Sequence, residues 1–420
     1  MTDTPQKFNI NAEAWLSNAG VRDVFKALLV PGHEVRIVGG AIRNALMGEP
    51  VNDIDMATTL HPDEVMKQAE GFGLKAIPTG IDHGTITLIS SGERIEVTTL
   101  RADVDTDGRR AEVKFGRDWL GDAARRDFTM NAIYCNSSGE IFDPLGGVDD
   151  LKKRRVRFIG NAQKRVREDY LRILRFIRFH GAYAKGPIDE DGMRACLSER
   201  RGLAALSRER IWAEFSKILM LNNASDTIQL MFDYGLLTQT LGGVPNLNRF
   251  KNLITIEDHL DLPTDAVRRL GALALFVSDD ARRLGDKFRL SQKEAQRLCA
   301  MTATHPDISA KMELKSAQKF IYRIGWTAFK DLLLLSESAS GSRTDKKYAE
   351  LVKLVELIQQ WTPPVFPVTG NDVLATGLEP GPQVGRILDA LEDEWLSADF
   401  EPGRDVLIAR LKAMHCPPGE

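Results

Sequence analysis

Two aspartates separated by a single residue, Asp53 and Asp55, are the side chains of this 420-residue sequence best suited to chemistry. They lie in segment 52–56, where polar and apolar residues alternate as in a half-buried β-strand. Because successive side chains of a strand point to opposite faces, both carboxylates fall on one face, with Cα atoms roughly 6.6 Å apart. Oxygen ligands at that spacing can converge on hard cations such as Mg²⁺. The pair predicts a metal site, although an Asp-x-Asp sequence taken alone is more often a pair of surface carboxylates.

A glycine turn just before the aspartates is suited to binding phosphate. Segment 35–38 is a mostly apolar run that predicts a buried strand, Gly39 and Gly40 end it, and segment 41–47 predicts a helix. Glycines let a ligand approach the backbone closely, and the helix N-terminus offers free N–H groups and a partial positive charge to a triphosphate. A Gly-Gly pair alone is usually only a turn, but beside two carboxylates it indicates metal-assisted phosphoryl transfer.

Further elements around these residues predict a mixed α/β domain. In chain order they are helices at 12–29 and 61–70 and strands at 74–78, 84–89 and 94–100. Glu96 lies in the last strand and faces away from Ile95 and Val97, so it is either a solvent-facing carboxylate or a third acidic group near the metals. The charged segment 101–118 predicts a long mobile loop, which is either a functional lid or an insert without a role.

An arginine pair follows this loop. Arg125 and Arg126 precede Asp127, and Phe128 and Met130 can anchor the segment to a core. A guanidinium matches the geometry of phosphate and keeps its charge, so the pair suits a triphosphate. The alternative is a structural Arg–Asp salt bridge.

A basic, strongly periodic segment at 164–179 predicts one continuous helix. Along it Asp169, Arg172, Arg175 and Arg178 recur at intervals of three and form a polar row. The row is either a solvated face with intrahelical ion pairs or a surface that reads a nucleotide base. In the second case the Asp169 carboxylate accepts, and the Arg172 guanidinium donates, hydrogen bonds that match the edge of a base.

The rest of the chain predicts helices. Ser207 predicts the N-cap of a helix that supports this basic segment, with Arg210 three residues inside it and either Arg208 or Arg210 touching RNA. Amphipathic helices broken by Gly, Pro and Asn clusters follow from about residue 226. Five basic side chains there either line an RNA path or are simply solvated: Lys311, Lys315, Lys319, Arg323 and Lys330.

Composition limits the remaining possibilities. With 43% apolar and 27% charged residues, the chain is typical of a soluble globular protein, and it is long enough for several domains. Because the net charge is −3, any nucleic-acid surface must come from local clustering of Arg and Lys. Four scattered cysteines argue against disulfides and a zinc site, and the N-terminus has no signal-peptide pattern. We expect a cytoplasmic protein without membrane contact and see no sign of a protein partner.

Taken together, the motifs resemble those of a known family. They are Gly39-Gly-Ala-Ile-Arg43, Asp53-x-Asp55, Arg125-Arg-Asp-Phe-Thr-x-Asn131, Asp143-Pro-Leu-Gly-Gly147 and Glu168-Asp-Tyr-Leu-Arg172-Ile-Leu-Arg175. The first two resemble the nucleotidyltransferase superfamily that includes DNA polymerase beta. The full set resembles the class II tRNA nucleotidyltransferase and bacterial poly(A) polymerase family, over about residues 35–215. One departure is Asn44, which stands where that family commonly has Asp.

The resemblance implies roles for these residues. Asp53 and Asp55 would hold two Mg²⁺ ions roughly 4 Å apart, and Glu96 would be the third acidic residue. Phosphate binding is implied for Gly40, Arg43, Arg125 and Arg126. Base selection is implied for Asp169 and Arg172, acting as a protein template, with Arg175 and Arg178 as further nucleotide contacts.

The predicted fold is α+β: a polymerase-beta-like head with a small mixed sheet, then an all-α neck, body and tail. The predicted domains are a catalytic head at 1–151, a base-reading neck at 152–225 and a tRNA-binding body and tail at 226–420. The predicted activity is template-independent addition of CCA to the 3′ end of tRNA from CTP and ATP. A poly(A) polymerase, an enzyme adding only CC or only A, and a non-catalytic RNA-binding protein are the alternatives.

Overall fold

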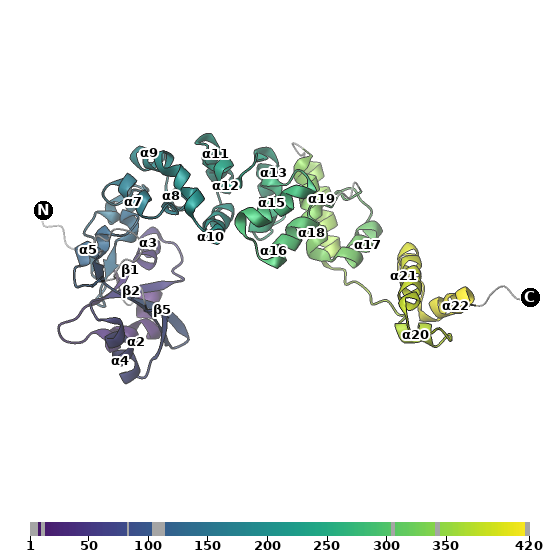
Figure 1. Ribbon diagram of the computed structural model, residues 1–420, viewed down its shortest axis with the longest axis horizontal. Helices are drawn as coiled ribbons and strands as arrows, with labels where there is room; N and C mark the ends of the chain where they lie inside the picture. The colour runs from purple at the N-terminus through teal and green to yellow at the C-terminus, as the bar shows by residue number, and fades with distance from the viewer. Residues whose placement is uncertain are drawn as a thin grey trace, which may run out of the picture. The chain divides into compact units, whose positions relative to one another are not determined.

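The chain forms two compact units, Met1–Leu236 and Leu237–Glu420 (Figure 1). The computed structural model describes residues 7–9, 13–81, 84–102, 114–303, 307–340 and 345–415. The first unit contains the predicted head and neck, and the second contains most of the predicted body and the tail. The limits expected at residues 151 and 225 stay predictions.

A seven-stranded mixed sheet forms the centre of the first unit, as the sequence predicts, and its strand order is β3-β4-β5-β2-β1-β8-β9. Strands β2 and β5 are parallel, and the other neighbouring pairs are antiparallel. The strands are β1 (Val35–Val38), β2 (Ile54–Thr58), β3 (Lys75–Gly80), β4 (Thr85–Ser90), β5 (Glu93–Thr99), β8 (Tyr134–Cys135) and β9 (Ile141–Phe142).

The two faces of the sheet have different coverings. Helices α2 (Ala19–Leu28) and α4 (Pro62–Gly71) pack against strands β3, β4 and β5 (Figure 1). On the opposite face, Val38 and Ala57 join a core that includes Trp119 and Tyr134. Asp55 shares the face of Val38, because the two residues are directly paired between β1 and β2. The sheet thus presents the aspartates on the side away from α2 and α4.

Two predicted helices are interrupted, each by a residue whose side chain binds a backbone N–H. The segment predicted as one helix at 12–29 is α1 (Ala14–Ser17) and α2, separated by Asn18, which accepts from the N–H of Gly20 at 2.8 Å. The segment at 164–179 is α7 (Ala162–Glu168) and α8 (Arg172–Tyr183), so the continuous helix was wrong. Asp169 is extended between them, at φ −154° and ψ 106°, and its carboxylate accepts from the N–H of Leu171 at 3.0 Å. Such a local bond competes with the helical ladder.

The predicted loop at 101–118 has paired ends. Strand β6 (Arg101–Ala102) is antiparallel to β7 (Lys114–Phe115), and residues 103–113, where most of the expected lid lies, fall outside the described residues. The Phe115 ring meets the His61 ring edge-on at 4.6 Å. It also fills the space beside Gly84, where a Cβ would lie 2.6 Å from it.

The remaining elements of the first unit are short helices. They are α3 (Gly40–Met47), α5 (Trp119–Ala124), η2 (Thr129–Asn131), α6 (Gly147–Lys152), α9 (Glu190–Glu199), η3 (Arg200–Ala205), α10 (Arg208–Leu219) and α11 (Ala224–Asp233). Helix α10 begins as predicted, because the Ser207 hydroxyl accepts from the N–H of Arg210. In the described part of the chain, no helix is long and apolar enough to cross a membrane.

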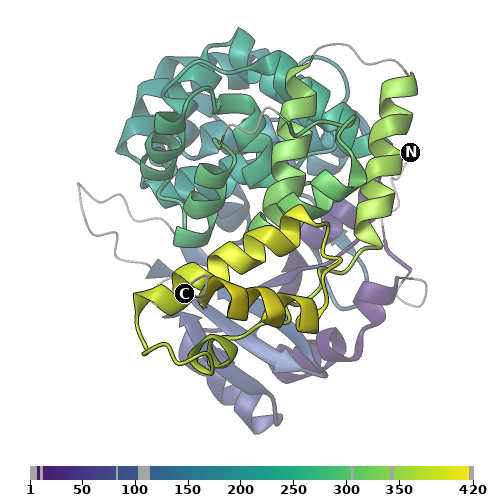
Figure 2. The same cartoon turned by 90° about the vertical axis from the view of Figure 1, so that its right-hand side faces the viewer.

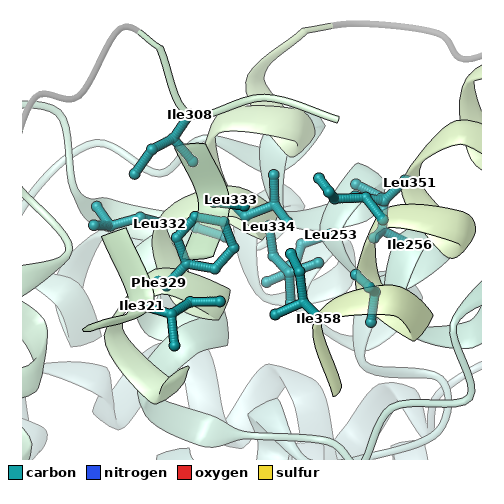
Figure 3. Packing of buried hydrophobic residues seen from close by; sticks show 14 residues of the cluster. Leu253, Ile256, Ile308, Ile321, Phe329, Leu332, Leu333, Leu334, Leu351 and Ile358 are labelled. Atoms are coloured by element: carbon teal, nitrogen blue, oxygen red, sulfur yellow. The ribbon is translucent and has the colours of Figure 1, made fainter. Parts of the chain in front are cut away.

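The second unit is helical, as predicted. Its helices are α12 (Leu236–Leu241), α13 (Leu247–His259), α14 (Ala266–Ala274), α15 (Ser278–Phe288), α16 (Gln292–Ala300), α17 (Leu314–Ile324), α18 (Trp326–Ala339), α19 (Asp345–Gln359), α20 (Gly370–Leu374), α21 (Pro382–Ser397) and α22 (Arg404–His415). Leu253, Phe329, Leu333 and Leu351 lie in its main core (Figure 3). Helices α20 to α22 enclose a smaller core at the C-terminal end (yellow in Figure 2).

The basic residues of α17 are paired with acids of the tail. Lys315 and Lys319 each approach Asp399 at 2.7 Å, and Arg323 approaches Asp393 at 2.7 Å. Since their charges have partners within this unit, an RNA phosphate would compete with these ion pairs for the three side chains.

Candidate active site

Strand register brings the glycine turn to the aspartates. The antiparallel pairing of β1 and β2 places Val38 opposite Asp55, and Gly39 follows Val38 directly. The turn that starts α3 and the carboxylate of Asp55 therefore lie at the same end of the sheet. Gly39 has φ +74° and ψ −113°, a conformation that strongly favours glycine, and its N–H donates to the Ile133 carbonyl at 3.1 Å.

Glu96 lies beside Asp55 on the neighbouring strand. The parallel pairing of β2 and β5 sets the two residues opposite each other, so they share a face across roughly 4.8 Å. Partial loss of hydration raises the pKa of the Asp55 carboxyl, and the negative charges of Glu96 and Asp53 raise this pKa further, whereas Arg126 lowers it. Three carboxylates thus repel one another at one point of the sheet.

This acidic group fits a divalent cation. Carboxylate oxygens are the ligands that Mg²⁺ prefers, and a bound cation would relieve the repulsion that acts on Asp55. Among the residues that the structure describes, no three His, Cys, Asp or Glu side chains form a ready-made metal cluster. Asp53 and Asp55 would therefore supply part of a coordination shell that water and substrate oxygens complete, which is usual for Mg²⁺.

Arg125 and Arg126 are both held by Asp122, a residue that the sequence analysis did not single out. The Asp122 carboxylate is buried and accepts from Arg125 Nε at 2.9 Å, from Arg126 Nη2 at 2.9 Å and from the Tyr134 hydroxyl at 2.7 Å. Burial alone would raise the pKa of Asp122, but the two guanidinium groups lower it below its ordinary value. The alternative of a structural Arg–Asp salt bridge is therefore confirmed for both arginines, with Asp122 as the acid. Asp122 lies three residues before Arg125 and four residues before Arg126, a spacing that is visible in the sequence.

Arg126 also faces the glycine turn. A Cβ placed on Gly39 would lie 4.0 Å from Arg126 Nη1 and 3.4 Å from the Asn131 carbonyl oxygen. The structure therefore brings one guanidinium, the start of α3 and the aspartates together. This combination can hold a triphosphate against a metal-binding carboxylate pair.

Arg43, a predicted phosphate contact at the start of α3, has several protein partners. Its guanidinium is buried, donates through Nη1 to Asn131 Oδ1 at 2.7 Å and lies 4.3 Å from the centre of the Tyr183 ring. Asn44, the departure from the family pattern, accepts from Arg43 Nε at 3.1 Å and Nη2 at 2.9 Å. Burial lowers the pKa of Arg43. With these protein partners, Arg43 joins α3 to Asn131 and to α8, and its contact with phosphate stays a prediction.

The two predicted base-reading residues are neighbours, although through a turn and not along a helix. The Arg172 N–H donates to the Asp169 carbonyl at 3.0 Å. Arg172 Nη1 donates to Glu168 Oε2 at 2.7 Å and to the Arg165 carbonyl at 2.9 Å. Asp169 Oδ2 accepts from Arg210 Nη2 of α10 at 2.7 Å. Sequence periodicity gave no sign of this partner, which is 41 residues away.

Arg175 and Arg178 are ion-paired across elements. Arg175 Nε donates to Asp127 Oδ2 at 2.8 Å, and Arg178 Nε donates to Glu214 Oε2 at 2.7 Å. Glu214 is a buried residue of α10, and Arg175 Nη1 also lies 3.7 Å from it. For these two residues the idea of intrahelical pairs is wrong, because their partners come from η2's flank and from α10. Arg175 therefore joins α8 to Asp127 and to α10, and Arg178 joins α8 to α10, so a nucleotide contact by either arginine would share its side chain with an existing ion pair.

Proteins of a known family are similar to this chain over most of its length. A family profile described as the Poly A polymerase head domain matches residues 35–157, and one described as a probable RNA and SrmB binding site of polymerase A matches residues 187–250. The mitochondrial CCA tRNA nucleotidyltransferase 1 of Homo sapiens is 32% identical over 406 residues, which cover 94% of this chain and 91% of that protein. The chain belongs to the CCA tRNA nucleotidyltransferase family. The CCA-adding enzyme of Lactococcus lactis is 29% identical and spans 94% of this chain and 96% of its own.

Solved structures of CCA-adding enzymes agree with this family and fold. The Bacillus stearothermophilus CCA-adding enzyme in complex with CTP matches with a TM-score of 0.73 and 26% identity, covering 94% of this chain and 98% of that one. The Thermotoga maritima CCA-adding enzyme complexed with tRNA shares the fold, with a TM-score of 0.65 and 19% identity. They confirm the predicted fold class, a nucleotidyltransferase head followed by helical domains. Membership of the CCA tRNA nucleotidyltransferase family also implies a divalent metal ion.

Proposed function

We propose that this CCA tRNA nucleotidyltransferase completes the 3′ end of tRNA from CTP and ATP, with Asp53 and Asp55 as its metal-binding catalytic carboxylates. The family membership supports the activity. The observation that carries the site assignment is the strand register that sets Val38 opposite Asp55 and Asp55 opposite Glu96. This register places the glycine turn and the acidic group at the same end of the sheet.

The metal would be Mg²⁺, held by Asp53 and Asp55, with Glu96 as the third acidic residue. When bound, Mg²⁺ supplies charge to neutralise the triphosphate and the leaving pyrophosphate and lowers the pKa of the RNA 3′-hydroxyl. Glu96 and Asp53 keep the site strongly negative, so it binds nucleotide only together with cations. This makes nucleotide affinity dependent on divalent metal.

Phosphates would be positioned by the backbone of Gly40 at the start of α3 and by Arg126. Helix N-termini bind anions through free N–H groups, and Arg126 Nη1 points toward this turn. Arg125 acts mainly through Asp122, which it helps to hold in its charged form. Placement and charge stabilisation supply most of the catalysis in phosphoryl transfer.

Base selection would come from Asp169 and Arg172. Cytosine and adenine both carry an exocyclic amino group, whereas uracil and guanine carry a carbonyl oxygen at the corresponding position. A carboxylate accepts from the amino group and repels the carbonyl, and a guanidinium donates to the ring acceptor beside it. Sites built this way can reject the wrong base by factors of roughly 10⁴–10⁵.

Incubating a tRNA that ends before CCA with CTP, ATP or both tests the proposal. We expect two CMP residues and then one AMP. Unlimited AMP addition without CMP would favour a poly(A) polymerase on the same scaffold, and arrest after CC, or AMP added only to a CC end, would favour a partial enzyme. Loss of activity in Asp53→Ala with unchanged tRNA affinity separates catalysis from simple RNA binding.

The domain roles and the location complete the proposal. The head at 1–151 would transfer the nucleotide, the neck at 152–225 would select it, and 226–420 would bind tRNA. Free Cys135, Cys196 and Cys299 are consistent with a reducing, cytoplasmic environment.

A further inference from the structure

We infer that Arg210 is a positioning residue that fixes the carboxylate of Asp169 for base selection, an inference that rests on the proposed function. Arg210 Nη2 lies 2.7 Å from Asp169 Oδ2, and the N–H of Leu171 donates to Asp169 Oδ1 at 3.0 Å. Each carboxylate oxygen is therefore held from a different direction. Both oxygens keep a free lone pair, since a carboxylate offers about four acceptor positions.

Asp169 needs such a partner because its backbone lies in the break between α7 and α8. A residue inside a helix is oriented by the ladder of backbone hydrogen bonds, but Asp169 is extended, at φ −154°. Arg172, in contrast, begins α8 and has two acceptors for one of its nitrogens, Glu168 Oε2 and the Arg165 carbonyl. Arg210 gives Asp169 a comparable second anchor from a separate helix.

The position of Arg210 is unfavourable for α10 itself. Its N–H donates to the Ser207 hydroxyl that caps the helix, so the charged side chain stands in the first turn. The partial positive charge of a helix N-terminus disfavours a cation there. Residues that are locally unfavourable, such as a cation at a helix N-terminus, occur mainly at functional sites. The ion pair with Asp169 supplies the compensation, which ties this arginine to the base-reading turn.

Selection between amino and carbonyl groups depends on this restraint. A fixed carboxylate stays next to the base edge and faces the carbonyl oxygen of uracil or guanine, so a wrong nucleotide is repelled. A carboxylate released by loss of Arg210 can rotate away from that oxygen, and the repulsion falls. Binding of cytosine and adenine also weakens, because their amino group meets an acceptor that must first be ordered.

The test compares Arg210→Gln with the wild type on a tRNA that ends before CCA. We expect the ratio of kcat/KM for CTP to that for UTP to fall at least about tenfold, the effect of losing one charge-assisted restraint. The KM for CTP should rise, while kcat at saturating CTP stays within about threefold. Arg210→Lys, which keeps the charge, should restore most of the ratio.

Arg194→Gln is the matched control. Arg194 is an exposed arginine of the same unit, 3.7 Å from the equally exposed Asp191, and we expect its loss to leave the ratio unchanged. A CTP-to-UTP ratio within twofold of wild type in Arg210→Gln, or an equal loss of kcat with all nucleotides, would overturn the inference. If Arg210→Gln does not fold, Arg210→Met takes its place with the same expected ratio. A wild-type enzyme that adds neither C nor A would instead refute the proposed function.

Discussion

Replacing Asp127 by Asn should both destabilise the first unit and impair catalysis. The Asp127 carboxylate is buried and accepts from Arg175 Nε at 2.8 Å, Arg175 Nη2 at 2.5 Å, Asn131 Nδ2 at 2.9 Å and the Phe128 N–H at 2.8 Å. An amide at this position removes the charge and turns one acceptor into a donor that faces other donors. Breaking a buried ion pair costs about 3–5 kcal/mol. Arg175 is partly exposed and keeps Glu214 at 3.7 Å, so we expect a smaller cost than that, about 2–3 kcal/mol.

The effect on activity follows from what the pair connects. Asn131 Oδ1 accepts from Arg43, which packs on Tyr183 of α8, so one chain of contacts joins α3 to the base-reading helix. Misplacing reacting groups by about 1 Å can cost about 10²-fold in rate. We therefore expect kcat/KM for CTP to fall by about 10²-fold in Asp127→Asn.

Thermal unfolding followed by circular dichroism, together with kcat/KM for CTP, measures both effects. For a unit of this size, 2–3 kcal/mol corresponds to a fall of roughly 4–12 °C in the unfolding midpoint. Asp149→Asn is the control, because Asp149 forms an exposed pair with Lys153 at 2.7 Å and should change stability by less than about 0.5 kcal/mol. A midpoint within 1 °C of wild type (roughly 0.25–0.5 kcal/mol by the same scaling) together with full activity in Asp127→Asn would refute this reasoning.

Four other outcomes can be measured. Asp55→Asn should lower kcat by about 10³-fold. It should not lower the unfolding midpoint, because the raised pKa of Asp55 means that its charge opposes folding at neutral pH. A lower midpoint would contradict this. Gly39→Ala should cost about 1–3 kcal/mol because of its φ of +74°, and an unchanged urea midpoint would show that the turn adapts. Glu257→Gln should cost about 3–5 kcal/mol, since it leaves buried Arg268 without its carboxylate at 2.8 Å; a smaller loss would mean that other acids take over. Below about pH 4, wild type should lose stability more steeply than Asp127→Asn. Burial raises the pKa of Asp127, but Arg175, Asn131 and the Phe128 N–H together lower it below its ordinary value, so the stabilisation is present above the unfolded pKa and is lost as pH falls. Parallel pH profiles of the two proteins would contradict this.

The order of the motifs predicted much of the head. An apolar run, two glycines, a helix and alternating aspartates have one economical arrangement, a strand-turn-helix followed by a neighbouring strand, and the structure has it in β1, α3 and β2. The period of two predicts that Asp53 and Asp55 share a face; in the structure Asp55 lies in β2 and Asp53 directly precedes this strand. The helical character of the C-terminal half likewise followed from amphipathic periodicity and from its breaks at Gly and Pro.

Periodicity could not predict the pairing partners. The pattern at 164–179 continues smoothly through Asp169, yet the helix breaks there because the side chain binds a backbone N–H and a distant arginine. Arg43 and Arg175 were expected at phosphates or bases, but contacts between separate elements hold them to Asn131 and Asp127. A local pattern carries no information about which charges a second helix or strand will supply.

The amino-acid sequence by itself determined the family, the α+β class and the carboxylate pair, because spacing along one strand or one turn fixes these over a few residues. Only the tertiary structure decided that Glu96 lies beside Asp55 and that Arg210 binds Asp169. It also decided that Asp122 accepts hydrogen bonds from both Arg125 and Arg126. Strand pairing and helix packing join residues far apart in the chain, and the free energy that selects those neighbours belongs to the whole fold.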